Sequence, residues 1–323
     1  MTESHNTPLS TWPWLNRLAQ FQTSIKTNWR WLGRAITVTV IIYIGVLLFV
    51  GREQLAQIDW TEYGRLFVFA ILIYLASLIP QLFVWLRMLA IHHPIGWVDI
   101  YIYMQTVLWR QIPGGAWHWA GRTTLYKATD RMPGRLVMLA SFFDWFLLLA
   151  TAFAVCGIFA FSLDWFWRLL LIGLSLGINI FLAAKWITAV NIHPRNALLE
   201  GSLWSTAYAF SWSMGGLLLY ILLPHDQVNQ ALSLAETTVI WAIAGGISSL
   251  AIIAPSGLGI REVSLTVLLQ PFYPVSFAVI VVVMLRFIFT LSDLIWGSLG
   301  WLISGRFLPD NSENSPANPD ISD

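Results

Sequence analysis

The sequence has few charged residues. Only 11% of its 323 residues are Asp, Glu, Lys or Arg, whereas soluble domains carry roughly 25%. So few charges cannot cover a water-facing surface, which excludes a soluble enzyme. Neither sign dominates, because 18 Lys and Arg face 17 Asp and Glu. This balance excludes the basic footprint of a nucleic-acid-binding protein, so we expect no nucleic-acid partner.

The chain is equally poor in cysteine. Its one cysteine, Cys156, lies inside an apolar run and cannot form a disulfide within the chain. A Cys-based zinc site needs several thiolates, and the histidines lack the spacing and acidic neighbours of a metal site. The sequence contains no Walker, GxSxG or HExxH pattern. We therefore expect neither a metal nor a cofactor.

Apolar residues, by contrast, make up 57% of the chain and gather in long runs. Runs that are apolar on every face and about 20 residues long predict membrane-spanning helices rather than barrel strands. We expect six crossings, at residues 35–50, 66–86, 136–161, 165–184, 203–223 and 275–303. Tryptophans near their ends are expected to be interfacial anchors: Trp60, Trp97, Trp165, Trp186 and Trp301.

Two further stretches, 99–127 and 236–270, are interrupted by IPGG at 112–115 and by APSGLG at 254–259. Proline removes a backbone donor and glycine frees the backbone, so each stretch predicts two half-helices around an unwound tip. The second halves, 116–128 and 258–270, have 13 residues each. Their length of about 20 Å cannot cross a hydrocarbon core of about 30 Å. We predict two re-entrant hairpins, although parity would also permit four full crossings.

The loops differ in basic charge, and this difference predicts the topology. Three basic residues fall on the outer side (Arg52, Arg65 and Arg168), four fall within the membrane (Arg110, Arg122, Arg261 and Arg286), and the others are cytosolic. By the positive-inside rule both termini lie in the cytosol, and the two hairpins enter from opposite sides. The fold class is therefore an all-α polytopic membrane protein with about six spanning helices and two oppositely oriented hairpins, as in inverted-repeat transporters.

The chain divides into three parts. Residues 1–34 mix tryptophan with Lys and Arg, which is typical of a cytosolic arm lying at the membrane interface. Residues 35–305 form the transmembrane domain. Residues 306–323 are polar, acidic and Pro-containing, and we expect a disordered cytosolic tail.

Arginines near the two tips suggest a binding site. The second half-helix of each hairpin starts at the tip, so its free N–H groups and positive dipole end lie at mid-membrane depth. A membrane-buried arginine costs about 2.5–3.5 kcal/mol and needs a partner, water or a ligand. We predict that Arg110, Arg122 and Arg261 line a basic cavity for a lipid phosphate or pyrophosphate. Alternatively, Arg110 and Arg122 extend to the cytosolic interface and the other arginines pair with acids.

Three acids are candidates for charge pairing or proton transfer: Asp144, Glu262 and Asp293. Arg286 and Asp293 are seven residues apart, about 10 Å along a helix, and cannot pair directly. We predict that Arg286 pairs with Glu262, which leaves Asp144 or Asp293 to a proton or to another arginine. Glu262 could instead complement the dipole of its half-helix, and a buried acid could only brace an arginine.

The phrases IPGGAWHWAGR (112–122) and IIAPSGLGIRE (252–262), followed by the Arg-bearing VVVMLRFIF, resemble a known family. They look like the membrane region of lysylphosphatidylglycerol synthases and of the stand-alone flippase-like proteins related to it, over about residues 35–305. In the synthases this region is implicated in moving an aminoacylated phospholipid between leaflets. The resemblance implies roles for Pro113, Gly114, Gly115, Arg122, Pro255, Gly257, Gly259, Arg261, Glu262 and Arg286.

The sequence also departs from the synthases. Their soluble aminoacyl-transfer domain is missing, so lipid synthesis is not implied. The first tip, with Trp117, is closer to stand-alone relatives associated with glycan or lipid-linked sugar pathways. Asp144 is followed by Trp145, where relatives tend to have an arginine.

The function predicted from the sequence is translocation of an anionic phospholipid or lipid-linked precursor across the cytoplasmic membrane. Membrane lipids are the expected partners. A second hypothesis is a non-catalytic membrane partner of a glycan or lipid synthase. A third is an integral-membrane transferase with Asp144, Glu262 or Asp293 as its base.

Overall fold

The computed structural model describes residue 49 and residues 60–111, 117–188, 195–224, 231–250 and 260–304, and every regular element in these ranges is a helix. The helices are α4 (Trp60–Ala90), α5 (Trp97–Leu108), the 3-10 helix η2 (Trp109–Gln111), α6 (Trp117–Ala128), α7 (Gly134–Phe159), α8 (Trp165–Thr188), α9 (Arg195–Leu222), α10 (Leu234–Leu250), α11 (Ile260–Leu269) and α12 (Val275–Ser304).

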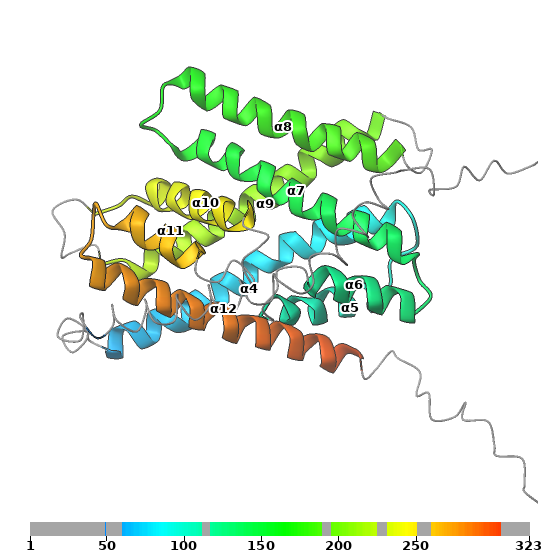
Figure 1. Cartoon of the computed structure of the whole chain (residues 1–323), viewed down its shortest axis with the longest axis horizontal. Helices are drawn as coiled ribbons and strands as arrows, with labels where there is room; N and C mark the ends of the chain where they lie inside the picture. The colour runs from blue at the N-terminus through cyan, green and yellow to red at the C-terminus, as the bar shows by residue number, and fades with distance from the viewer. Residues whose placement is uncertain are drawn as a thin grey trace, which may run out of the picture.

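The helix order contains the same series twice. A long helix, two short helices and a long helix follow one another in α4–α7 and again in α9–α12, with α8 between the two series. The short helices α5 and α6 lie toward one end of the long helices, and α10 and α11 lie toward the other (Figure 1). Helix α8 lies at the edge of the molecule and packs on α7 and α9.

Within the described residues, four helices are long and apolar enough to cross a membrane: Gly64–Ala90, Gly134–Phe159, Trp165–Ile187 and Val275–Leu302. They confirm the prediction of a helical membrane protein. Helix α9 is also long, but its middle is rich in serine and aromatic residues, and side chains such as Trp204 and Ser205 are buried against neighbouring helices. Apart from residue 49, the predicted crossing at 35–50 lies outside the described residues, so the count of six stays a prediction.

Local signals explain where several helices begin. Ser233 and Glu236 form a reciprocal cap at the start of α10, in which the Ser233 N–H donates to Glu236 Oε2 (2.8 Å) and the Glu236 N–H donates to Ser233 Oγ (3.3 Å). Pro133 and Pro274 directly precede α7 and α12. Proline suits this position because the first turn of a helix needs no intrahelical N–H donor.

The apolar core consists of two clusters stacked along the long helices. One surrounds α5 and α6 and includes Trp85, Val107 and Leu147. The other surrounds α10 and α11 and includes Trp241 and Leu285. Helices α4, α7 and α9 contribute one part of their length to each cluster, so each pair of short helices has its own apolar surroundings.

Most of the tryptophans expected at the interface face outward. Trp97, Trp165 and Trp301 are 54%, 73% and 68% exposed. The prediction is wrong for Trp186, which is fully buried and donates its Nε1–H to the Met88 carbonyl at 2.9 Å. Its indole is a core group because α8 packs closely on α7 and α9 at this point. The side chain of Trp60 lies outside the described part.

The interrupted stretches contain short helices close to the predicted half-helices. Helix α6 has 12 residues and α11 has 10, about 18 and 15 Å at 1.5 Å per residue. The tips between the half-helices, with Pro113, Gly114, Gly115, Pro255, Gly257 and Gly259, lie outside the described residues.

Candidate functional site

Arg122 lies in the middle of α6 and is 1% exposed. Its guanidinium lies between two aromatic rings, 4.2 Å from the ring centroid of Trp85 and 4.5 Å from that of Tyr103. These rings belong to α4 and α5. Aromatic faces attract a cation, most strongly where water is excluded. The alternative in which Arg122 extends to the cytosolic interface is therefore wrong.

Polar partners complete the surroundings of Arg122. Its Nε donates to Thr106 Oγ1 at 3.3 Å, and its Nη1 donates to Asp144 Oδ2 at 3.1 Å. The other carboxylate oxygen of Asp144 accepts a hydrogen bond from the Tyr208 hydroxyl of α9. Asp144 thus braces a buried arginine, which is one of the alternatives left open by the sequence.

A second arginine is held in the same manner at the start of α11. The guanidinium of Arg261 lies 4.0 Å from the ring centroid of Trp241 in α10 and 4.6 Å from that of Phe289 in α12. Unlike the Nε of Arg122, its Nε is buried without a hydrogen-bond acceptor in the part of the chain that the structure describes. An unsatisfied donor of a charged group is costly in an apolar interior, so this arginine has capacity for an anionic ligand.

The remaining acids lie beside the second arginine. Arg286 Nη1 is 3.7 Å from Glu262 Oε1, which confirms the predicted pairing. Asp293 Oδ1 lies 3.5 Å from the hydroxyl of Tyr74 in α4. The Tyr74 ring in turn packs on Phe289, with 4.7 Å between the centroids. Arg286 and Asp293 have different partners here, as their spacing predicts.

Basic groups from both interrupted stretches converge on Tyr74. Its hydroxyl is within electrostatic range of Arg110, which precedes the first tip, and of Arg261 and Arg286. Arg110 also interacts electrostatically with Asp293 and with Asp144. It therefore links the polar groups around Tyr74 to those around Arg122. Among the described residues around Tyr74 there are three arginines against two acids, Glu262 and Asp293, which leaves a formal charge of one positive unit.

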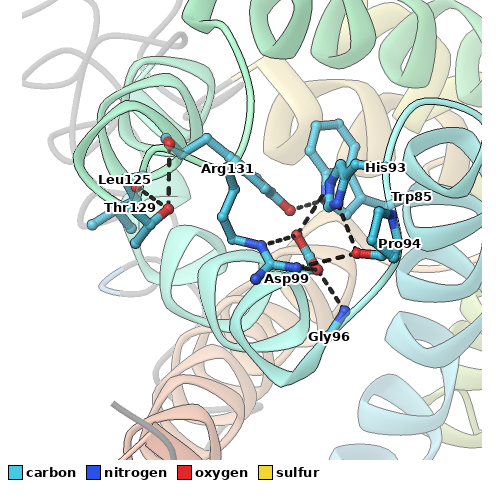
Figure 2. A network of polar contacts seen from close by, with 9 residues as sticks. Trp85, His93, Pro94, Gly96, Asp99, Leu125, Thr129 and Arg131 are labelled. Atoms are coloured by element: carbon cyan, nitrogen blue, oxygen red, sulfur yellow. Dashed lines mark hydrogen bonds and ion pairs between the residues drawn. The ribbon is translucent and has the colours of Figure 1, made fainter. Parts of the chain in front are cut away.

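A third polar network lies at the start of α5 and the end of α6 (Figure 2). Asp99, in the first turn of α5, is fully buried. Its Oδ2 accepts from the Gly96 N–H at 2.7 Å and from Arg131 Nη2 at 2.9 Å. His93 Nε2 lies 3.4 Å from Asp99 Oδ1. Because Arg131 follows α6, this network ties the start of α5 to the end of α6.

Tyr126 lies between this network and the buried Arg122. Its hydroxyl accepts a hydrogen bond from Trp85 Nε1 at 3.3 Å, and Trp85 is one of the rings facing Arg122. In the nearby loop, burial lowers the pKa of His92 to about 4, and the neighbouring His93 adds to this effect. His92 packs edge-on against Trp186 at 4.6 Å.

Several residues of this site escape the sequence reasoning. They are the aromatic partners of the arginines and the tyrosines that contact the acids: Tyr74, Trp85, Tyr103, Tyr208, Trp241 and Phe289. The available signal is general, since an arginine in an apolar helix needs electron-rich rings nearby. It does not say which of many aromatic residues supplies them.

Within the described ranges, no group of three or more His, Cys, Asp or Glu side chains is placed to hold a metal ion. The groups brought together at the site are arginines, carboxylates and aromatic rings. No family model matches the chain, and no curated protein matches it.

Proposed function

We propose that the chain moves an anionic phospholipid or lipid-linked precursor between the leaflets of the cytoplasmic membrane. The observation that carries this proposal is the placement of Arg261, whose guanidinium lies between Trp241 and Phe289 and whose buried Nε has no acceptor among the described residues, with Arg110 and Arg286 nearby. A buried excess of arginine is unfavourable in a bilayer unless an anion compensates it. A lipid headgroup supplies such an anion while its acyl chains stay in the membrane.

The chemistry of Arg261 favours a phosphate group. Arg261 is the second residue of α11, at the end of the helix where free N–H groups and the positive dipole end attract anions. A guanidinium binds phosphate oxygens through charge-assisted hydrogen bonds, and its Nε is available for one. A phosphodiester carries one negative charge at neutral pH, which equals the formal excess around Tyr74.

The helix contacts support an inverted repeat. Exchanging α4–α7 with α9–α12 maps the observed contacts onto each other: α5 packs on α12 as α10 packs on α7, and α6 packs on α7 as α11 packs on α12. The contact between α4 and α9 maps onto itself. A single long helix, α8, separates the two series, and one crossing between them reverses the orientation of the second. In our proposal α5–α6 and α10–α11 are therefore two re-entrant hairpins of opposite orientation.

The resemblance to the membrane region of lysylphosphatidylglycerol synthases supports the same proposal. It rests on the two sequence phrases at 112–122 and 252–262, which contain Arg122 and Arg261. In our proposal the two arginines have different roles. Arg122 is already compensated by Asp144, whereas the Nε of Arg261 has no acceptor among the described residues, so Arg261 receives the headgroup.

The proposal is tested in proteoliposomes that contain a fluorescent phosphatidylglycerol. Replacing Arg261 with Ala removes a charged hydrogen-bond donor worth about 1.5–3 kcal/mol, so we expect translocation to fall by about tenfold or more. Arg87→Ala is the matched control, because Arg87 pairs with Glu200 outside the site and its side chain is 44% exposed. Unchanged translocation in both Arg261→Ala and Arg286→Ala would reject the proposal.

Lipids that copurify with the protein provide a second measurement. Mass spectrometry is expected to find an anionic phospholipid or polyprenyl-phosphate lipid with the native chain and less of it with Arg261→Ala. A transferase would form product in detergent, where no leaflets exist. Product formation under these conditions would contradict a pure translocator.

A further inference from the structure

Two tyrosines make equivalent contacts in the two series of helices. Tyr208 of α9 donates to Asp144 of α7, and Tyr74 of α4 faces Asp293 of α12 at 3.5 Å. The exchange that relates the helix contacts maps α9 onto α4 and α7 onto α12. It therefore maps one tyrosine–aspartate pair onto the other. In each pair, the first helix of one series reaches the last helix of the other series.

The same short pattern surrounds both tyrosines in the sequence. Residues 74–77 read YLAS and residues 208–211 read YAFS, so each tyrosine precedes a serine by three positions. The two serines meet where α4 and α9 cross, since Ser211 Oγ donates to the Ser77 carbonyl at 2.9 Å. Both tyrosines thus lie one turn from the same crossing.

The two tyrosines lie on opposite sides of this crossing. Helices α4 and α9 are antiparallel, because Ser77 meets Ser211 and, ten residues further along α4, Arg87 meets Glu200. Each tyrosine precedes its serine by three residues, so in this antiparallel pair Tyr74 and Tyr208 lie on opposite sides of the crossing. Pro80 lies in α4 one turn after Ser77, and a proline there removes a helical hydrogen bond and allows bending.

The two equivalent contacts differ in this structure. Tyr208 is hydrogen-bonded to Asp144, whose partner Arg122 is closed off from the surface. The Tyr74–Asp293 separation of 3.5 Å exceeds the usual range for an O–H···O bond. The tyrosine–aspartate hydrogen bond is therefore formed at Tyr208 and Asp144 and is lengthened at Tyr74 and Asp293.

We infer that Tyr74 and Tyr208 are equivalent positioning residues whose contacts with Asp293 and Asp144 are made alternately during translocation. In one state Tyr208 is hydrogen-bonded to Asp144 and the Tyr74–Asp293 distance is long, as in this structure. In the other state Tyr74 is hydrogen-bonded to Asp293 and the Tyr208–Asp144 distance is long. This inference rests on the inverted repeat of the proposed function. It assigns to each tyrosine the role of holding its half closed, apart from any contact with the headgroup.

The inference is tested by thiol accessibility in membranes. In a Cys156→Ser background, Thr123→Cys in α6 reports on the first half and Ser249→Cys in α10 reports on the second. Tyr208→Phe removes the contact made here, so reactivity toward a membrane-impermeant reagent is expected to rise at position 123 and fall at position 249. Tyr74→Phe is expected to shift both in the opposite direction. A hydrogen bond to a charged group changes such an equilibrium by about tenfold.

The direction of the shifts separates an alternating role from a packing role. Changes of the same sign in both variants, or no change, would overturn the inference. If Tyr208→Phe fails to fold, Asp293→Leu, which removes the acceptor of the Tyr74 hydroxyl, is used beside Tyr74→Phe, and the two must shift the reporters in the same direction. Opposite shifts without lipid translocation would retain the positioning role and reject the proposed function. Translocation with parallel shifts would reject only the positioning role.

Discussion

The clearest energetic prediction concerns the buried pair of Arg122 and Asp144. Arg122 is 1% exposed, and its Nη1 lies 3.1 Å from Asp144 Oδ2. Removing one partner of such a pair leaves an uncompensated charge, at a cost of about 3–5 kcal/mol. We therefore expect Arg122→Met alone, or Asp144→Asn alone, to lower the free energy of unfolding by this amount.

The double variant should be more stable than either single one. With both charges removed, what remains is the loss of attraction between the guanidinium and the rings of Trp85 and Tyr103, about 2 kcal/mol. The side-chain amide introduced by Asp144→Asn would keep an oxygen that accepts from Tyr208. The four free energies of unfolding are measured by tryptophan fluorescence during titration from native micelles into denaturing detergent. The coupling energy follows from this double-mutant cycle.

A second cycle on Arg87 and Glu200 provides the control. The Arg87 side chain is 44% exposed and that of Glu200 is 11% exposed, so solvent screens this pair more than the buried one, and the expected coupling is smaller. Equal coupling energies in the two cycles would refute the reasoning. So would a double variant of Arg122 and Asp144 whose loss equals the sum of the single losses, because the pair would then not be a brace.

Three further outcomes follow from single positions. His92 has its pKa lowered to about 4 by burial and by His93, against about 6.5 when unfolded. Its stabilisation is thus complete above pH 6.5 and lost progressively as the pH falls toward 4, and melting temperatures at pH 7.5 and 5 should converge in His92→Phe. A Cβ at Gly215 would lie 1.9 Å from Trp241 Nε1, so Gly215→Ala should displace that ring and reduce translocation, whereas Gly173→Ala, with nothing within 4 Å, should not. Asn179 donates to two hydroxyls at 2.7 and 3.0 Å, so Asn179→Ala should lower the free energy of unfolding by about 2 kcal/mol in a detergent titration.

The long helices could be predicted because apolarity alone specifies them. The run expected at 136–161 is a helix over Gly134–Phe159, and the run expected at 275–303 is a helix over Val275–Ser304. Helix α9 begins at Arg195, eight residues before the expected start at 203. Its first turns are polar and carry Glu200, which pairs with Arg87. A helix that is stabilised by a neighbouring helix has no apolar signal at that end.

The site could be predicted only where its partners are close in the chain. Glu262 and Arg286 lie on consecutive helices, and their pairing was correctly expected. Arg122 and Tyr208 both contact Asp144, but the tyrosine is 64 residues away from it. No local pattern specifies which helices meet. Trp186 shows the same limit, since its position near a helix end predicts exposure while the packing of α8 buries it.

Arg122 and Arg261 represent two ways of keeping an arginine inside an apolar helix bundle. Both guanidiniums lie between two aromatic rings, so the rings alone do not distinguish their roles. The difference lies in the acceptors: Asp144 and Thr106 accept hydrogen bonds from Arg122, whereas the Nε of Arg261 has no acceptor among the described residues. An arginine that is satisfied internally contributes stability and gains little from a ligand. An arginine with an unsatisfied donor is stabilised by a ligand that accepts from it. For this reason we assign the headgroup to Arg261.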